Sequence, residues 1–204
     1  ETSLPEALVA LAERAGAPVW IPDDVEGTCC GVPFSSKGYV EANAFAVNRA
    51  IERFWAWSDG GRLPVVVDTS PCTYGLKACR PQLTPENQVR FDGLTILDAV
   101  AFTHDALLAR LAARRKAGPV VLHPVCSLTK MGLGAKLEAI ARFCSDDVTV
   151  PLSAGCCAFA GDRGFLHPEL TASATRQEAA EVRAKGCAEP LARCRPCEVG
   201  MPRA

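Results

Sequence analysis

The most constraining feature of this 204-residue chain is a repeated arrangement of cysteines and helical stretches. Residues 27–39, GTCCGVPFSSKGY, have the same plan as residues 155–165, GCCAFAGDRGF: a Cys-Cys pair, a loop with small residues, an aromatic residue and then a long helical stretch. Residues 69–76, TSPCTYGL, align with residues 194–201, CRPCEVGM, so that the last cysteine, a glycine three residues later and the next apolar residue coincide. We therefore interpret the chain as two copies of one half-domain.

Short β-branched runs alternate with longer alanine-rich stretches along the sequence. This pattern predicts an α/β fold with mostly parallel sheets, arranged here as two related Rossmann-like half-domains over residues 1–117 and 118–204. Strands are expected at residues 18–21, 64–68, 94–97, 120–123 and 148–151, with a weak one before Cys194. Helices are expected where apolar residues recur three or four positions apart, at residues 4–15, 39–57, 98–116, 134–143 and 168–185.

The composition restricts the classes of function. Eleven cysteines are more than an ordinary domain uses and fewer than a small disulfide scaffold has. Their odd number and two adjacent pairs favour metal binding in a reducing compartment, because adjacent cysteines can present two thiolates to one metal but cannot bond each other without strain. A net charge of −1 without a basic stripe argues against nucleic-acid binding. No apolar run approaches the ~20 residues that cross a bilayer, and the acidic side chains are expected on solvated helix faces.

The second copy carries five thiols in three groups, with the spacing C-x29-C-C-x36-C-x2-C: Cys126, Cys156, Cys157, Cys194 and Cys197. Soft thiolates in this number exceed what a tetrahedral zinc site needs and favour an iron–sulfur cluster, with zinc as the alternative. Each group stands where a predicted strand or loop gives way to a helix, so backbone N–H groups can stabilise the thiolates. His123 is expected to cap or to form a hydrogen bond rather than to bind metal, and Cys144 is expected to pack in the core.

The first copy has an incomplete motif. Cys29, Cys30 and Cys72 match the pattern, but Thr69 stands where a cysteine is expected, and the leading cysteine would fall just before residue 1. From this we expect that the chain was cut from a longer polypeptide. With at most four thiols, this second metal site is expected to hold zinc, to hold a cluster or to be empty.

Several segments resemble the cysteine-rich CCG domain of the heterodisulfide reductase type, a module that occurs twice in those enzymes: GTCCGVPFSSKGY, DTSPCTYGL, HPVCS, GCCAFAGDRGFLHPELTASAT and CEVGM. They are most similar to the C-terminal part of D-lactate dehydrogenases that contain FAD and iron–sulfur clusters, and the resemblance covers essentially the whole chain. It implies that FAD, bound on a part of the polypeptide outside this chain, oxidises a D-2-hydroxy acid. This domain would then relay electrons to a quinone, a cytochrome or another acceptor.

The resemblance also implies partners, a cofactor and a location. The partners are an FAD-binding domain and a ferredoxin-like domain of the same polypeptide, in the cytoplasm or peripherally at the inner membrane. The implied cofactor is a [4Fe–4S] cluster or a noncubane pair of fused clusters, with these ligands: Cys126, Cys156, Cys157, Cys194 and Cys197.

Two other functions stay open at this point. A disulfide-reducing catalytic protein like heterodisulfide reductase would require an open pocket beside Cys156 and Cys157. A zinc-stabilised interaction domain is the other alternative. For the leading interpretation we expect no catalytic residue on this chain, which alone would be inactive as an enzyme.

Overall fold

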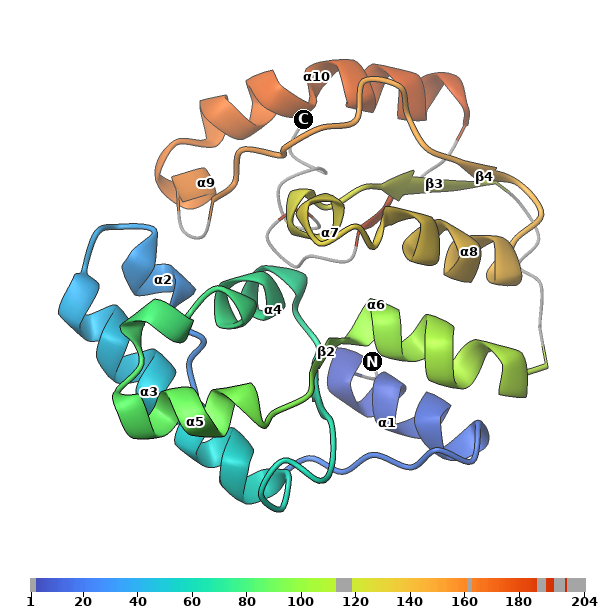
Figure 1. Ribbon diagram of the computed structural model, residues 1–204. Coiled ribbons are helices and arrows are strands. Elements are labelled where there is room, and N and C mark those ends of the chain that lie inside the picture. The colour runs from blue at the N-terminus through green and yellow to red at the C-terminus, as the bar shows by residue number, and fades with distance from the viewer. Residues whose placement is uncertain (1–2, 113–118, 161–162, 187–189, 193–196, 198–204) are drawn as a thin grey trace. The chain divides into compact units, whose positions relative to one another are not determined.

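The chain forms two compact units, residues 1–111 and residues 112–204 (Figure 1). The computed structural model describes residues 3–112, 119–160, 163–186, 190–192 and 197. The boundary that we predicted between residues 117 and 118 lies outside the described residues. Both units combine helices with short parallel strands. Within the described part of the chain, no helix is both long enough and apolar enough to span a membrane.

The first unit contains a two-stranded parallel sheet, in which β1 (Val65–Val67) pairs with β2 (Ile96–Asp98). Its first helix, α1 (Leu4–Arg14), begins with a capping box, in which Ser3 and Glu6 each accept from the other's backbone N–H. The other helical elements follow in chain order: α2 (Val32–Ser35), α3 (Val40–Trp57), α4 (Ser70–Lys77), η1 (Arg80–Gln82), α5 (Pro85–Asp92), α6 (Ala99–Phe102), the π-helical η2 (Thr103–Leu107) and the 3-10 turn η3 (Leu108–Arg110).

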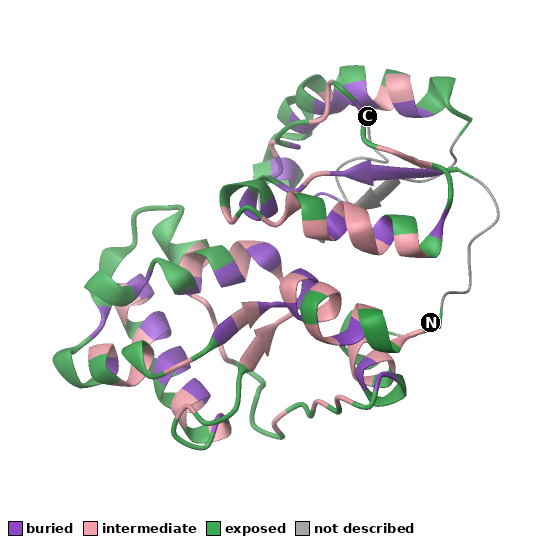
Figure 2. Ribbon diagram, turned by 45° about the vertical axis from the view of Figure 1, so that its right-hand side comes forward, coloured by how far each residue is buried: buried purple, intermediate pink, exposed green. Residues whose placement is uncertain are grey.

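The sheet of the first unit is covered by helices on both faces. Val65 and Val67 pack against the cluster formed by the buried face of α3, which includes Ile51 and Phe54. Val66 points the other way and packs with α1 and the segment that follows β2. Successive side chains of a strand point to opposite faces of the sheet, so both faces are apolar here, as is usual for parallel sheets. Figure 2 shows the buried residues of these helices on the sides turned toward the strands.

The second unit contains a three-stranded parallel sheet in the order β4 (Val148–Thr149), β3 (Val120–His123), β5 (Pro190–Ala192). The central strand β3 is buried at every position, as Figure 2 shows by its purple colour. The helix α8 (Gly134–Cys144) packs on β3 and β4. The other helices are α7 (Cys126–Lys130), α9 (Arg163–Leu166) and α10 (Pro168–Ala184).

One of the predicted strands is wrong. Residues 18–21 form no strand. Pro18 begins this segment and Pro22 follows it directly, and neither proline has the backbone N–H that strand pairing needs. The helix predicted over residues 98–116 is present in part: it is made up of α6, η2 and η3 and ends at Arg110, while residues 113–116 lie outside the described part. The short helices beside the cysteine loops were not predicted, because a helix of one or two turns is too short to show an apolar period.

The core assignment of the first unit can be tested on α3. Ile51 is fully buried there, and Ile51→Ala should lower the free energy of unfolding by about 2–5 kcal/mol because it leaves a cavity. Phe45 on the same helix is 69% exposed, and Phe45→Ala should change this free energy by no more than ~0.5 kcal/mol. Urea unfolding followed by tryptophan fluorescence measures the first unit specifically, because it contains all three tryptophans. Equal unfolding midpoints for the two variants would contradict this core.

Candidate metal centre

The carboxyl ends of β3 and β5 lie at the same edge of the second sheet, because the two strands are parallel. β3 ends at His123, and β5 ends at Ala192, five residues before Cys197 (192 to 197). Cys126 is the first residue of α7, which follows β3. Ligand sites in open α/β sheets form outside this edge. The topology thus gathers these residues at the edge where a site is expected.

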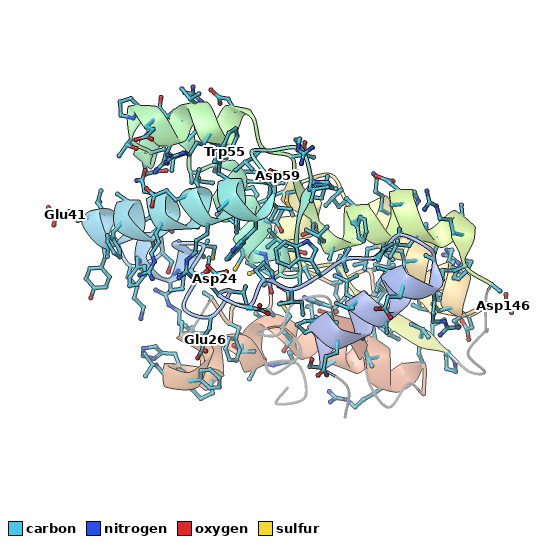
Figure 3. The ribbon with its side chains drawn as sticks, turned by 90° about the horizontal axis from the view of Figure 1, so that it is seen from below. Asp24, Glu26, Glu41, Trp55, Asp59 and Asp146 are labelled. Atoms are coloured by element: carbon cyan, nitrogen blue, oxygen red, sulfur yellow. The ribbon has the colours of Figure 1, made fainter. Side chains whose placement is uncertain are left out.

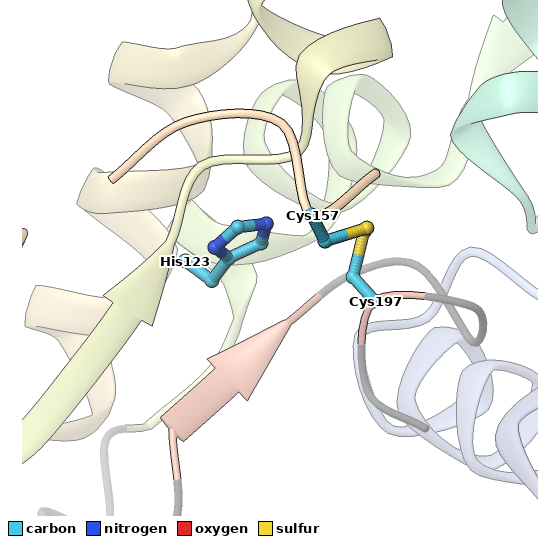
Figure 4. Close-up of side chains that lie close together, drawn as sticks. All are labelled: His123, Cys157 and Cys197. Atoms are coloured by element: carbon cyan, nitrogen blue, oxygen red, sulfur yellow. The ribbon is translucent and has the colours of Figure 1, made fainter. Parts of the chain in front are cut away.

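Three buried side chains converge there. One nitrogen of His123 and the Sγ atoms of Cys157 and Cys197 all lie within 4.8 Å of one another. The two sulfur atoms are 3.0 Å apart. Figure 4 shows the imidazole of His123 facing the two cysteines, one of which comes from the loop after β4 and the other from the segment after β5. Imidazole and thiolate are the ligands that zinc and iron prefer in proteins.

Cys126 and Cys156 lie beside this group and are exposed. The pKa of Cys126 is raised, first by burial and then by the neighbouring thiols of Cys156 and Cys157. Of the five ligands predicted from the sequence, Cys194 lies outside the described residues. The other four share one neighbourhood, with two thiols buried and two at the surface.

The surroundings of Cys157 stabilise its thiolate. The pKa of Cys157 is lowered to about 6, chiefly because the thiol of Cys197 donates a hydrogen bond to it. The backbone N–H of Phe159 acts in the same direction, whereas burial opposes it. A thiolate is the form that binds metal, so this residue is prepared for ligation near neutral pH.

The loop that carries the Cys-Cys pair has an unusual backbone. Ala158 and Ala160 adopt φ angles of 55° and 43°, in the left-handed region that non-glycine residues seldom occupy. Such conformations cost of order 1–3 kcal/mol each and are found mainly where a functional site requires them. They also turn N–H groups toward sulfur: the N–H of Ala158 donates to Sγ of Cys156 at 3.4 Å. Phe159 lies between these two residues, and its buried ring packs edge-on against Phe165, with 4.8 Å between the ring centroids.

Glu178 was missed by sequence reasoning. We expected acidic residues on solvated helix faces, but Glu178 on α10 is buried, and its two carboxylate oxygens lie 2.8 and 3.0 Å from Nδ1 of His123. The only signal in the sequence was a spacing of three or four residues, which puts four positions on one face of α10. The structure buries all four of them, although most are polar: Thr171, Thr175, Glu178 and Val182. For His123 we expected a hydrogen bond, and this bond is present.

The first unit has a corresponding thiol pair. The Sγ atoms of Cys30 and Cys72 are 2.8 Å apart, and these residues align with Cys157 and Cys197 in the sequence repeat. Gly31, which follows the Cys-Cys pair, has a φ of 80°, the same left-handed region as Ala158. A Cβ atom on this glycine would collide with side chains of α3.

The loop that leads to Cys29 and Cys30 is held on α3. The indole N–H of Trp57 donates to Asp24 at 2.7 Å, and Arg53 donates to the backbone oxygen of Glu26 at 3.1 Å. Figure 3 shows Asp24 and Glu26 on this loop and Trp55 and Asp59 at the end of the helix. These bonds fix the entry of the chain into the Cys-Cys motif.

A cavity of about 580 Å³ lies beside the thiols of the first unit. Most of its wall is apolar, and Cys29, Cys30 and Cys72 are among the residues that line it. Examples of the apolar lining are Leu8, Val19, Trp20, Phe54, Val66 and Phe102. A space of this size takes a ligand as large as an ordinary cofactor or drug.

Two cysteines outside these groups differ from each other in burial. Cys144 is exposed, so our expectation that it packs in the core was wrong: it lies on the same helix face as the buried Leu137 and Ala141, but it is the last residue of α8. Cys79 is buried, and burial raises its pKa to about 11.

The thiol pair of the first unit makes a testable prediction about reactivity. Hydrogen bonding from Cys72 is the largest cause that lowers the pKa of Cys30, from 9.0 to about 7. Cys72→Ala should return this pKa toward 9, so that the thiolate fraction at pH 7 falls from about half toward about 1%. The greater nucleophilicity of a more basic thiolate offsets part of this loss, so we expect alkylation of Cys30 to slow about five- to tenfold at pH 7.

The measurement is the rate of iodoacetamide modification of Cys30 against pH, by peptide mass spectrometry on protein treated with a chelator. Cys79→Ala is the control and should leave the profile of Cys30 unchanged. Identical profiles for Cys72→Ala and the parent protein would contradict the proposed stabilisation of the Cys30 thiolate.

The comparison with known protein families found a match for only part of this chain. No curated protein matches the chain. The matched range of the family model ends at residue 77, so it includes Cys29, Cys30 and Cys72, the motif that sequence analysis treated as incomplete. Together with the group of His123, Cys157 and Cys197, the match indicates a metal- or iron–sulfur-binding protein with a role in electron transfer. Residues 1–77 match the model of the CCG cysteine-rich domain.

Proposed function

We propose that this chain is an electron-transfer module that binds an iron–sulfur cluster in its second unit. The observation that carries the proposal is the convergence of Cys157 and Cys197 at the carboxyl edge of a parallel sheet, with Cys126 and Cys156 beside them. The aligned thiol pair in the first unit supports a pseudo-duplicated, Rossmann-like arrangement of two half-domains. The match of the first unit to a cysteine-rich domain supports the same class of function.

The residues present fit such a cluster in number and in chemistry. Four cysteines would hold it, namely Cys126, Cys156, Cys157 and Cys197, and Cys194 is the fifth candidate from the sequence. The cluster, when bound, supplies one-electron redox chemistry. The chain's contribution is to fix the thiolates, to direct the N–H groups of Ala158 and Phe159 at them and to keep water away with the ring of Phe159.

The wider context is also part of the proposal. We infer that the module belongs to a flavin-dependent D-lactate dehydrogenase, as the sequence segments around its cysteines suggest. It would accept electrons from FAD on another domain, by way of a ferredoxin-like domain, and pass them to a quinone, a cytochrome or a similar acceptor. The compartment would be the cytoplasm or the surface of the inner membrane.

The test is metal analysis on protein purified without oxygen and reconstituted with iron and sulfide. Cys157→Ser should remove most of the bound iron, because it replaces the buried thiolate at the centre of the group, and Cys156→Ser should do the same. Cys144→Ser is the matched control, since this exposed cysteine lies at the end of α8, and it should retain the iron of the parent protein. Equal iron in all three variants would contradict the ligand assignment. Zinc alone, with no iron after reconstitution, would favour a zinc-stabilised interaction domain instead.

A second function is favoured by the first unit. The pair of Cys30 and Cys72 lies in the wall of the apolar cavity, which is the kind of open pocket that disulfide reduction requires. In the sequence analysis, this function required an open pocket beside Cys156 and Cys157. In such a reaction the thiolate of Cys30 attacks the substrate disulfide and releases one thiol, and Cys72 then displaces the other. The two cysteines become a disulfide, and the two electrons and two protons that they lose convert the substrate to two thiols.

This alternative predicts a trapped intermediate. With an apolar aromatic disulfide as the probe, the metal-free parent protein should form the Cys30–Cys72 disulfide, because the second thiol is only 2.8 Å away. Cys72→Ser should instead accumulate a mixed disulfide on Cys30, which mass spectrometry of the peptides would identify. If the probe modified the exposed Cys144 as fast as Cys30, the cavity would have no role in recognition and this alternative would fail.

A further inference from the structure

One ring nitrogen of His123 has a hydrogen-bond partner, and the other has none among the described residues. The residue is fully buried at the end of β3, and its Nδ1 lies 2.8 and 3.0 Å from the oxygens of Glu178, which is also buried. A carboxylate accepts hydrogen bonds, so Nδ1 carries the proton and donates it. In the neutral ring, Nε2 therefore presents a lone pair.

This lone pair points toward sulfur. Nε2 is completely buried and has no hydrogen-bond partner among the described residues. Figure 4 shows the ring turned so that the nitrogen on its far side faces Cys157 and Cys197, whose sulfur atoms lie within 4.8 Å of the histidine. Leaving a buried acceptor unpaired costs about 1–3 kcal/mol, so a partner for this atom is expected.

Charge gives an independent reason for a cation at the same place. Glu178 brings a carboxylate into the interior, where its hydrogen-bond partner is His123, and no lysine or arginine is paired with this carboxylate in the described part of the chain. Buried charges of one sign are stable only when a counter-charge or a metal compensates them. A carboxylate that holds a histidine whose second nitrogen faces two thiolates is the usual outer arrangement of a metal site.

We propose that Nε2 of His123 is a direct ligand of the metal centre held by Cys157 and Cys197, and that Glu178 is a positioning residue that fixes the tautomer and orientation of His123. The site is therefore of mixed nitrogen and sulfur character and takes zinc or iron. The inference deepens the proposed function and, where the metal is iron, rests on it. If the imidazole takes the place of one of the candidate thiolates other than Cys157 and Cys197, the ligand set becomes less negative, which raises the reduction potential of an iron–sulfur centre.

The test uses the whole chain and does not depend on a variant that folds. The protein is labelled with 15N-histidine, reconstituted with iron and sulfide, reduced and examined by pulsed EPR. A nitrogen coupling that changes with the isotope is expected. The sequence has three histidines and His104 lies in the first unit, so variants of His123 and His167 are enough to assign the coupling. The same labelled protein loaded with zinc is examined by X-ray absorption, where an imidazole ligand gives a characteristic multiple-scattering pattern.

The matched variants use the other histidine–glutamate pair of the second unit. His167 and Glu169 lie 3.3 Å apart and are exposed, so His167→Ala and Glu169→Gln should leave the coupling and the metal affinity unchanged. His123→Ala should remove the coupling. Glu178→Gln should keep it but weaken zinc binding about 10- to 100-fold, the usual effect of losing such an outer partner.

The outcomes separate this inference from the proposed function. Bound iron with the isotope-sensitive coupling supports both, whereas bound iron without it leaves the proposed function intact and overturns His123 as a ligand. Zinc bound through imidazole without any iron supports the ligand and overturns the redox role. Zinc bound by sulfur alone, or no metal at all, overturns the inference, and in both cases the absence of iron also overturns the proposed function.

Discussion

The parallel pairing of β3 with β5 is the constraint on which the candidate centre depends. Parallel strands end at the same edge, so the pairing of His123 with Ala192 places the start of each following loop at one point in space. One loop then leads to Cys126 and the other to Cys197. Residues that are 74 positions apart in sequence (123 to 197) thereby become neighbours. The backbone hydrogen bonds of three residue pairs thus determine the distance between the candidate ligands.

The same constraint explains why the cysteine spacing was informative. Cys30 and Cys72 were aligned with Cys157 and Cys197 from sequence alone, and each pair has its sulfur atoms within 3.0 Å. In each unit the second cysteine of the pair follows a strand by five residues (67 to 72 and 192 to 197). In the first unit, β1, a short loop and the start of α4 leave little freedom in where Cys72 lies. Spacing therefore predicted contact, although it says nothing about which metal the contact serves.

Other features were beyond the reach of sequence patterns. The bond between His123 and Glu178 joins residues 55 positions apart, and Glu178 lies in a helix whose composition is that of a solvated surface. Its burial depends on how α10 sits against β3, which helical periodicity does not specify. The opposite error occurred at Cys144, where an apolar run suggested burial and the helix instead ends at the surface. In both cases the local pattern was right about the helix and wrong about the burial of one residue on it.

The two Cys-Cys loops differ in a way that bears on where function is concentrated. Both place the residue after the pair in the left-handed region, and the first unit uses Gly31 there, which adopts this conformation without strain. The second unit uses Ala158 and follows it with Ala160 in the same region, so it holds its loop in shape against a conformational cost. That cost has to be offset by contacts around the loop, and the buried ring of Phe159 against Gly164 is one of them, because a Cβ on this glycine would collide with the ring. A loop that is held rigidly also holds its sulfur atoms rigidly, which limits reorganisation when a bound centre changes its charge. The strain therefore supports, independently of the number of thiols, the proposal that the second unit holds the redox centre.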